Sequence, residues 1–101
     1  MAKLLRHTLY VGLNDKDTKK QVCNRHVARK MVMSICGDCT ISDTLGRYTH
    51  DDGTKVTERG LKVELLFKAD NEVMQFAQQI KKELNQESIA LVKDYIQSEL
   101  V

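Results

Sequence analysis

The fold of this chain is decided by the stretch Leu9-Tyr10-Val11-Gly12-Leu13-Asn14-Asp15-Lys16-Asp17-Thr18-Lys19-Lys20-Gln21. Its first five residues continue an alternation of apolar and mixed side chains that begins at Leu5, and this period of two predicts a half-buried strand over residues 5–13. The polar residues 14–17 predict a turn. Thr18 and Gln21 match the capping box, in which Ser or Thr is followed three residues later by Glu or Gln, and they predict a helix that begins there.

The predicted first helix runs from Thr18 to about Cys36 and is followed by Gly37, the residue type that most often follows a helix C-terminus. Apolar residues at helical spacing predict its buried stripe, which consists of Val22, Val27, Ala28, Met31, Val32 and Ile35. The basic residues expected to face outward are Arg25, Arg29 and Lys30.

Two strands are predicted next, over residues 40–49 and 55–67. The turn between them contains Asp52-Gly53, a frequent hairpin signal, and it also carries His50. Arg59-Gly60 suggests a bulge in the second of these strands.

A second helix is predicted over residues 70–84, with Asp70 as its N-cap. Its buried stripe follows the helical period and consists of Val73, Phe76, Ala77, Ile80 and Leu84. Residues 88–96 predict a last strand, in which Ile89, Leu91 and Tyr95 share one face.

The resulting order, βαββαβ, predicts a single α+β domain over residues 1–101 with ferredoxin-like topology: a four-stranded antiparallel sheet with two helices on one face. The other face of such a sheet is uncovered. The phase of the strands lines it with Arg6, Thr8, Tyr10, Lys62 and Glu64. This face could bind a ligand or a second copy of the chain, or it could stay in water as a polar surface.

The composition limits the classes of function. The chain has 101 residues, of which 42% are hydrophobic and 30% charged, as is typical of one globular domain. Its formal net charge of +2 is far below that of proteins that bind nucleic acid mainly through phosphates, although a local basic patch is compatible with it. No apolar run could cross a membrane, and the polar N-terminus does not resemble a signal peptide. Three cysteines without an export signal predict free thiols and a cytoplasmic protein.

Signals for redox, metal or catalytic chemistry are weak. Cys36-Gly37-Asp38-Cys39 has the spacing of a redox motif, but it follows the predicted helix, at the end where the helix dipole disfavours a thiolate. Cys23 and His26 share a helical face without a second pair of ligands, so we expect no metal, and no motif implies a cofactor. His7 or His50 beside carboxylates would serve a small enzyme, although no residue is assigned as catalytic.

A basic cluster surrounds the predicted start of the first helix. Lys16, Lys19 and Lys20 lie there, although the helix dipole disfavours cations at that end. Together with free backbone amides, the lysines would form a site for a phosphate, a nucleotide or an acidic partner. The alternative is that Asp15 and Asp17 neutralise them and that all five side chains are solvated.

Two families share features with this chain. Residues 9–13 resemble the first-strand motif of RNA-recognition motif domains, and residues 59–65 lie where the second motif would be. That resemblance implies bases stacked on aromatic side chains, but only Tyr10 is aromatic here. The second resemblance extends over nearly the whole chain and is to small uncharacterised ferredoxin-like proteins of Firmicutes and their phages and plasmids. The residues that carry it are 9–21 and 46–54. This second resemblance implies a cytoplasmic context and a mobile-element origin, and it implies no activity.

The leading hypothesis is therefore a non-catalytic binding or regulatory protein that forms a homodimer through its open sheet face or edge strands. Its ligand would be a protein, such as a host defence protein, or a small anion. The residues expected to contact it are Lys16, Lys19, Lys20 and Tyr10. The alternative is a nucleic-acid-binding module, whose expected contacts are Tyr10, Arg25, Arg29 and Lys30.

Overall fold

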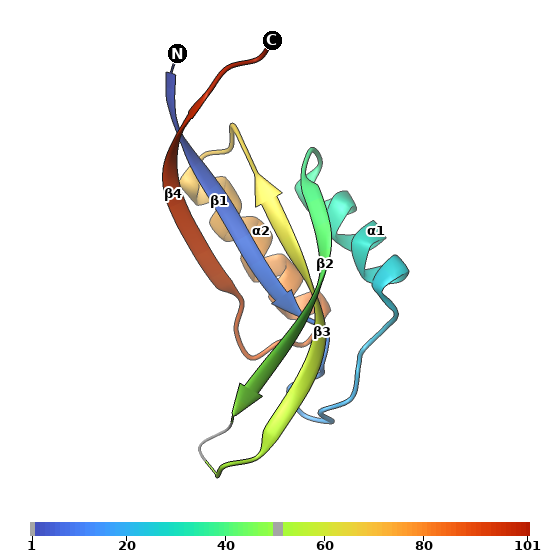
Figure 1. Ribbon diagram of the computed structural model, residues 1–101. Coiled ribbons are helices and arrows are strands. Elements are labelled where there is room, and N and C mark those ends of the chain that lie inside the picture. The colour runs from blue at the N-terminus through green and yellow to red at the C-terminus, as the bar shows by residue number, and fades with distance from the viewer. Residues whose placement is uncertain (1, 50–51) are drawn as a thin grey trace.

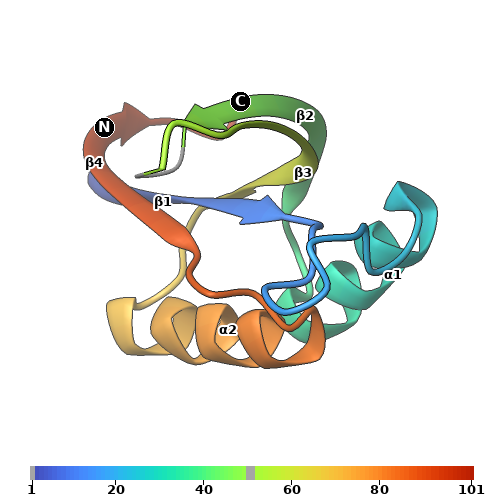
Figure 2. The same cartoon turned by 90° about the horizontal axis from the view of Figure 1, so that it is seen from below.

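The computed structural model describes residues 2–49 and 52–101 and confirms the ferredoxin-like α+β fold. Its elements are β1 (Ala2–Gly12), α1 (Arg25–Cys36), β2 (Thr40–Thr49), β3 (Lys55–Leu65), α2 (Asp70–Glu83) and β4 (Ala90–Ser98) (Figure 1). The strands form one antiparallel sheet in the order β2-β3-β1-β4. Both helices lie on the same side of this sheet, and the β2–β3 hairpin curves over the opposite side (Figure 2). Within the described residues, neither helix has the length and apolar character needed to span a membrane.

The predicted start of the first helix is wrong. α1 begins at Arg25, and its N-cap is Asn24, whose side-chain oxygen accepts a hydrogen bond of 2.9 Å from the backbone amide of Val27. The hydroxyl of Thr18 instead accepts a bond of 3.3 Å from the backbone amide of Lys20, inside a loop. The polar side chains at 18–21 therefore stabilise a local turn, which competes with helix formation in such sequences.

The register of β3 is continuous along both of its neighbours. Gly60 pairs with Gly12 of β1, where that ladder ends, and with Thr44 of β2, where the pairs continue on both sides without a slip. The bulge predicted at Arg59-Gly60 is therefore absent. The β2–β3 hairpin is confirmed, and Gly53 in its turn has a φ of 86°, a conformation that glycine adopts readily.

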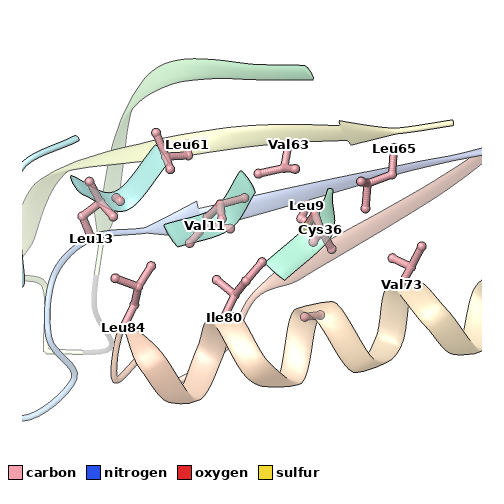
Figure 3. Close-up of a cluster of buried hydrophobic side chains, with 13 residues drawn as sticks. Leu9, Val11, Leu13, Cys36, Leu61, Val63, Leu65, Val73, Ile80 and Leu84 are labelled. Carbon is pink, nitrogen blue, oxygen red and sulfur yellow. The ribbon is translucent and has the colours of Figure 1, made fainter. Parts of the chain in front are cut away.

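The core lies between the sheet and the two helices (Figure 3). It is built from alternate residues of β1 and β3 and from one stripe of each helix. Its buried members are Leu9, Val11, Leu13, Ala28, Val32, Cys36, Leu61, Val63, Leu65, Val73, Ala77, Ile80 and Leu84. Burial of each large apolar side chain contributes roughly 1.5–3 kcal/mol to folding.

The stripe predicted for the second helix is confirmed, whereas part of the first is wrong. Val22 is 40% exposed because it lies in the loop before α1. Val27 is 50% exposed because it lies in the first turn of α1 on the side away from the core. Met31 and Ile35 are half-buried and pack against the core as expected.

Asp70 is the first residue of α2 and is not its N-cap. The cap position belongs to Ala69, which makes no side-chain cap bond. The Asp70 carboxylate is used differently: its Oδ1 lies 2.6 Å from Nε2 of the fully buried His7 and 3.3 Å from Nζ of Lys93. The hydrogen bond with His7, supported by Lys93, lowers the pKa of Asp70. These contacts tie the start of α2 to β1 and β4.

Candidate functional site

Glycines hollow the open face of the sheet at one end. Gly12 and Gly60 are paired across β1 and β3, and Gly46 of β2 pairs with Glu58 of β3. Since Gly12 and Gly46 carry no side chain, the side chains of Glu58 and Tyr48 pack directly over them. A Cβ on Gly12 would lie 2.5 Å from Oε1 of Glu58, and a Cβ on Gly46 would lie 2.6 Å from the phenol oxygen of Tyr48. The glycines thus seat a carboxylate and a phenol against the sheet.

The Glu58 carboxylate is held in place at this hollow. Its Oε2 accepts a hydrogen bond of 2.9 Å from the backbone amide of Asn14, which lies just beyond the end of β1. Glu58 is only partly exposed, so the protein around it screens its charge less than water would. The result is a fixed negative charge on the open face.

A groove of about 990 Å³ extends from this hollow toward the loop after β1. Four segments line it: the end of β1, the loop over residues 14–19, the β2–β3 hairpin, and the segment between α2 and β4. Tyr10 and Tyr48 contribute aromatic surface. A smaller hollow of about 190 Å³ is lined by the same two tyrosines together with Gly12, Gly46 and Glu58.

Among the residues that the structure describes, the groove carries more acidic than basic side chains. Its acidic lining residues are Asp15, Asp52, Glu58 and Glu87. Its basic lining residues are Lys16 and Lys19. Because the whole chain has a net charge of +2, this acidity is local. Such a groove attracts a ligand that carries positive charge, and it can accommodate one anionic group near the lysines.

The loop that carries these lysines is fastened to the segment after α2. The backbone amide of Lys16 donates to the carbonyl of Asn85 at 3.0 Å. The side-chain amide of Asn85 donates to the carboxylates of Asp15 and Asp17, both at 3.0 Å, and Gln86 donates to the carbonyl of Asn14 at 2.9 Å. The bond from Asn85, followed by bonds from backbone amides of the same turn, lowers the pKa of Asp15. The loop is therefore a fixed wall of the groove.

Three of the four residues expected to contact a ligand lie together. Tyr10, Lys16 and Lys19 line the groove, whereas Lys20 does not. None of the lysines lies in a first helical turn, because α1 begins at Arg25. The helix-dipole argument for an anion site therefore fails, and the lysines are positioned by the loop instead.

The residues expected to contact nucleic acid are divided between the two faces of the sheet. Tyr10 lies on the open face, while α1 lies on the other face and carries Arg25, Arg29 and Lys30. Arg25 and Arg29 both pair with Asp43 of β2, at 3.5 and 2.7 Å. No single surface therefore combines the tyrosine with these cations.

The cysteines and the two described histidines, His7 and His26, lie apart from the groove. Burial raises the pKa of Cys36 to about 11, and it also raises the pKa of Cys39, which disfavours their thiolates. In the described part of the chain, no three His, Cys, Asp or Glu side chains are grouped so that they could hold a metal ion. His7 is buried beneath α2, and His50, the other histidine expected to serve an enzyme, lies outside the described residues.

Sequence reasoning missed Glu58 and Tyr48. Both come from the β2–β3 hairpin. Tyr48 lies within residues 46–54, which carry the second resemblance, but that resemblance implies no ligand contact, and Glu58 lies in neither of the stretches that carry it. The available signal was the set of glycines on neighbouring strands, Gly12, Gly46 and Gly60. That these glycines lie close together can be recognised only when the register of the three strands is known.

No protein-family model matches the chain, and no curated protein matches it. Among solved structures, it is similar to a phage SAM lyase in complex with S-methyl-5'-thioadenosine, with a TM-score of 0.69 and 19% identity over 97% of this chain and 92% of that chain. The apo state of a phage SAM lyase aligns with a TM-score of 0.67 and 18% identity over 96% and 91% of the two chains. At these identities the likeness establishes a shared fold and no more.

Proposed function

We propose that this chain binds S-adenosylmethionine in the open-face groove and cleaves it to S-methyl-5'-thioadenosine. The observation that carries the proposal is the fixed Glu58 carboxylate in a groove that also presents Tyr10 and Tyr48. The similarity to the phage SAM lyase, which spans almost the full length of both chains, supports the choice of ligand.

The groups in the groove match the parts of S-adenosylmethionine. Its adenine is a flat aromatic ring, which stacks favourably on the ring of a tyrosine. Its sulfonium is a cation, which a carboxylate and the faces of aromatic rings both attract. Glu58 and the two tyrosines supply these partners on one surface. The excess of acidic side chains around the groove favours the same positively charged ligand.

The role of Glu58 follows from how charge moves in the reaction. When the bond between sulfur and Cγ of the amino-acid fragment breaks, both bonding electrons pass to sulfur, which becomes the neutral thioether of S-methyl-5'-thioadenosine. Since a lyase adds no water, Cγ must regain an electron pair from its own fragment: either a carboxylate oxygen bonds to it and closes a lactone ring, or the Cβ–H bond supplies the pair, forms a double bond and releases its proton. The positive charge on sulfur therefore decreases toward the transition state, so a carboxylate near it strengthens substrate binding more than it accelerates the chemistry. Glu58 is accordingly proposed as a binding residue.

The proposal is tested by two measurements on the wild-type protein: calorimetric titration with S-adenosylmethionine, and chromatographic detection of S-methyl-5'-thioadenosine after incubation. We expect Glu58→Gln to weaken binding about tenfold, because it removes the charge but keeps an oxygen for the Asn14 amide. Glu83→Gln is the matched control, because Glu83 lies at the end of α2 and does not line the groove.

The two measurements separate the possible outcomes. A wild-type protein that binds no S-adenosylmethionine contradicts the whole proposal. Binding without release of S-methyl-5'-thioadenosine contradicts the enzyme and supports the non-catalytic binding protein expected from the sequence. Equal affinities for wild type, Glu58→Gln and Glu83→Gln contradict the role of Glu58.

A phage or plasmid origin and a homodimer form part of the same proposal. The origin is supported by the resemblance of residues 9–21 and by the fold shared with a phage protein. The homodimer is supported by the two edge strands, β2 and β4, which carry Leu45 and Tyr95 with exposed fractions of 71% and 80%. Light scattering should give twice the mass of the chain, and a monomer at high concentration would contradict the dimer.

A further inference from the structure

Lys16 and Lys19 are the basic groups that line an otherwise acidic groove. Lys19 has a φ of 64°, a left-handed conformation that is uncommon for residues other than glycine and that persists only where surrounding bonds enforce it. Here its backbone amide donates to the carbonyl of Asp15 at 2.9 Å, and its ammonium donates to the carbonyl of Lys16 at 2.6 Å. The Lys19 ammonium is therefore held against its own loop by the bond to the Lys16 carbonyl.

The loop around the two lysines is closed on itself and fixed from outside. Asn14 and Gln21 form a β-bridge across its base, and the backbone amide of Asp15 donates to the carbonyl of Lys20 at 2.8 Å. Asn85 then fastens the loop to the segment after α2. Groups that are positioned before a ligand arrives bind it more tightly, because less conformational freedom is lost on binding.

The lysines and Glu58 come from different segments that line the same groove. Glu58 belongs to the hairpin and reaches Gly12, while the lysines belong to the loop beyond the end of β1. The amino-acid end of S-adenosylmethionine carries a carboxylate, and ammonium groups are natural partners for it. Among the described residues that line the groove, only these two lysines carry a positive charge that could bind that carboxylate.

We infer that Lys16 and Lys19 bind the α-carboxylate of the substrate, so that the groove selects adenosyl compounds that carry an amino-acid end. This inference rests on the proposed function and names the residues that determine its specificity. It also gives the expected anion site a physical basis that does not depend on a helix dipole.

The test compares two ligands that lack a sulfonium, so that the contribution of Glu58 to sulfonium binding does not enter. S-adenosylhomocysteine has the carboxylate, and S-methyl-5'-thioadenosine does not. In calorimetric titrations, the Lys16→Gln/Lys19→Gln variant should bind S-adenosylhomocysteine about tenfold more weakly than wild type and S-methyl-5'-thioadenosine equally well. Lys20→Gln is the control from the same loop and should change neither affinity. Lys19→Arg, which keeps the charge, should retain most of the affinity for S-adenosylhomocysteine.

Each other outcome has a definite meaning. If the double variant loses affinity for both ligands alike, the lysines shape the loop and do not bind the carboxylate, and the inference is overturned. Unchanged affinity for S-adenosylhomocysteine overturns it as well. A wild-type protein that binds S-adenosylmethionine but not S-adenosylhomocysteine overturns this inference alone, whereas one that binds none of the three compounds overturns the proposed function as well. Thermal denaturation of every variant shows whether the fold is intact.

Discussion

The two faces of this sheet are built from neighbouring residues of the same strands, yet they contribute differently. On the covered face, Leu9 and Val63 are fully buried against the helices. On the open face, Tyr10 and Glu58 remain partly exposed at the groove. Because successive side chains of a strand point to opposite faces, a single substitution can affect one face and leave the other intact. Stability and ligand binding should therefore be separable within one strand.

The ion pairs of the open face contribute little to stability, in contrast to the buried side chains of the covered face. Away from the groove, the open face carries a two-bond pair between Arg6 and Asp94, at 3.1 and 2.6 Å, and a pair between Lys62 and Glu64 at 3.2 Å. The contacts within the first pair raise the pKa of Arg6 and lower that of Asp94. All four side chains are about a third exposed or more, and ion pairs at such positions add little stability. The covered face is therefore the main source of folding energy.

The largest expected effect comes from comparing adjacent residues of β1. Leu9→Ala should lower the free energy of unfolding by about 3 kcal/mol, since it leaves a cavity in the core. Tyr10→Ala should lower it by less than about 1 kcal/mol, because Tyr10 is 42% exposed, and should instead weaken ligand binding. Urea denaturation measures the first quantity and calorimetric titration the second. If both variants lose the same stability, the proposed separation of the two faces is wrong.

The covered face could be predicted from the sequence because burial follows a period. Alternation in β1 and β3 and the stripe of α2 each place apolar side chains on one side, and the core contains those residues. The RNA-recognition motif resemblance is informative for the same reason. That resemblance would place stacking aromatics at Leu61, Val63 and Leu66. Leu61 and Val63 are fully buried beneath the helices, Leu66 is 37% exposed, and none of the three is aromatic. No aromatic platform can form from them.

The groove could be predicted only in part, because it depends on contacts between distant segments. Tyr10, Lys16 and Lys19 were found because they lie in one continuous stretch. Glu58 joins them through strand register, and Asn85 through side-chain bonds to the loop. The error at the start of α1 has a local cause: the pattern at 18–21 that marks a helix start also stabilises a turn, and here the turn is bonded to the segment after α2.

The next largest effect is expected from Gly60→Ala. A Cβ at this position would lie 2.5 Å from the backbone carbonyl oxygen of Val11 on the neighbouring strand. Backbone in the middle of a sheet cannot move away without disturbing its hydrogen bonds, so we expect a loss of about 2 kcal/mol in the free energy of unfolding. Urea denaturation measures this change. A variant as stable as wild type would show that β1 and β3 can separate locally at this pair.

Gly12→Ala, at the paired position, should affect mainly the site. Its Cβ would lie 2.5 Å from Oε1 of Glu58, the end of a flexible side chain that can move aside. Stability should fall by less than about 1 kcal/mol, corresponding to the lost bond between Glu58 and the Asn14 amide. Affinity for S-adenosylmethionine should fall severalfold because the carboxylate is displaced. Gly60→Ala is the matched comparison, and a Gly12→Ala variant with unchanged affinity would show that the position of Glu58 is unimportant.

The smallest effect concerns the contact that holds α2 on the covered face. The hydrogen bond with His7, supported by Lys93, lowers the pKa of Asp70 below its ordinary value of 3.8. The unfolded chain therefore binds a proton at Asp70 more readily than the folded chain does. The stability that this carboxylate adds is complete above its ordinary pKa and is lost as the pH falls through its lowered value.

Asp70→Asn should therefore melt at a lower temperature than wild type at about pH 5, and the difference should shrink as the pH is lowered toward about 3. Glu72→Gln is the control, because it removes a carboxylate from the same helical turn and leaves the one that bonds to His7. A pH dependence of the melting temperature that both variants share reflects the charge at the start of the helix. Only the part specific to Asp70→Asn reports the contact with His7. Ligand affinity at neutral pH should be equal in the two variants, because both residues belong to α2, which lies on the covered face, and neither lines the groove. A loss of affinity confined to Asp70→Asn would show that the contact beneath α2 is coupled to the open face, and that the two faces are not independent.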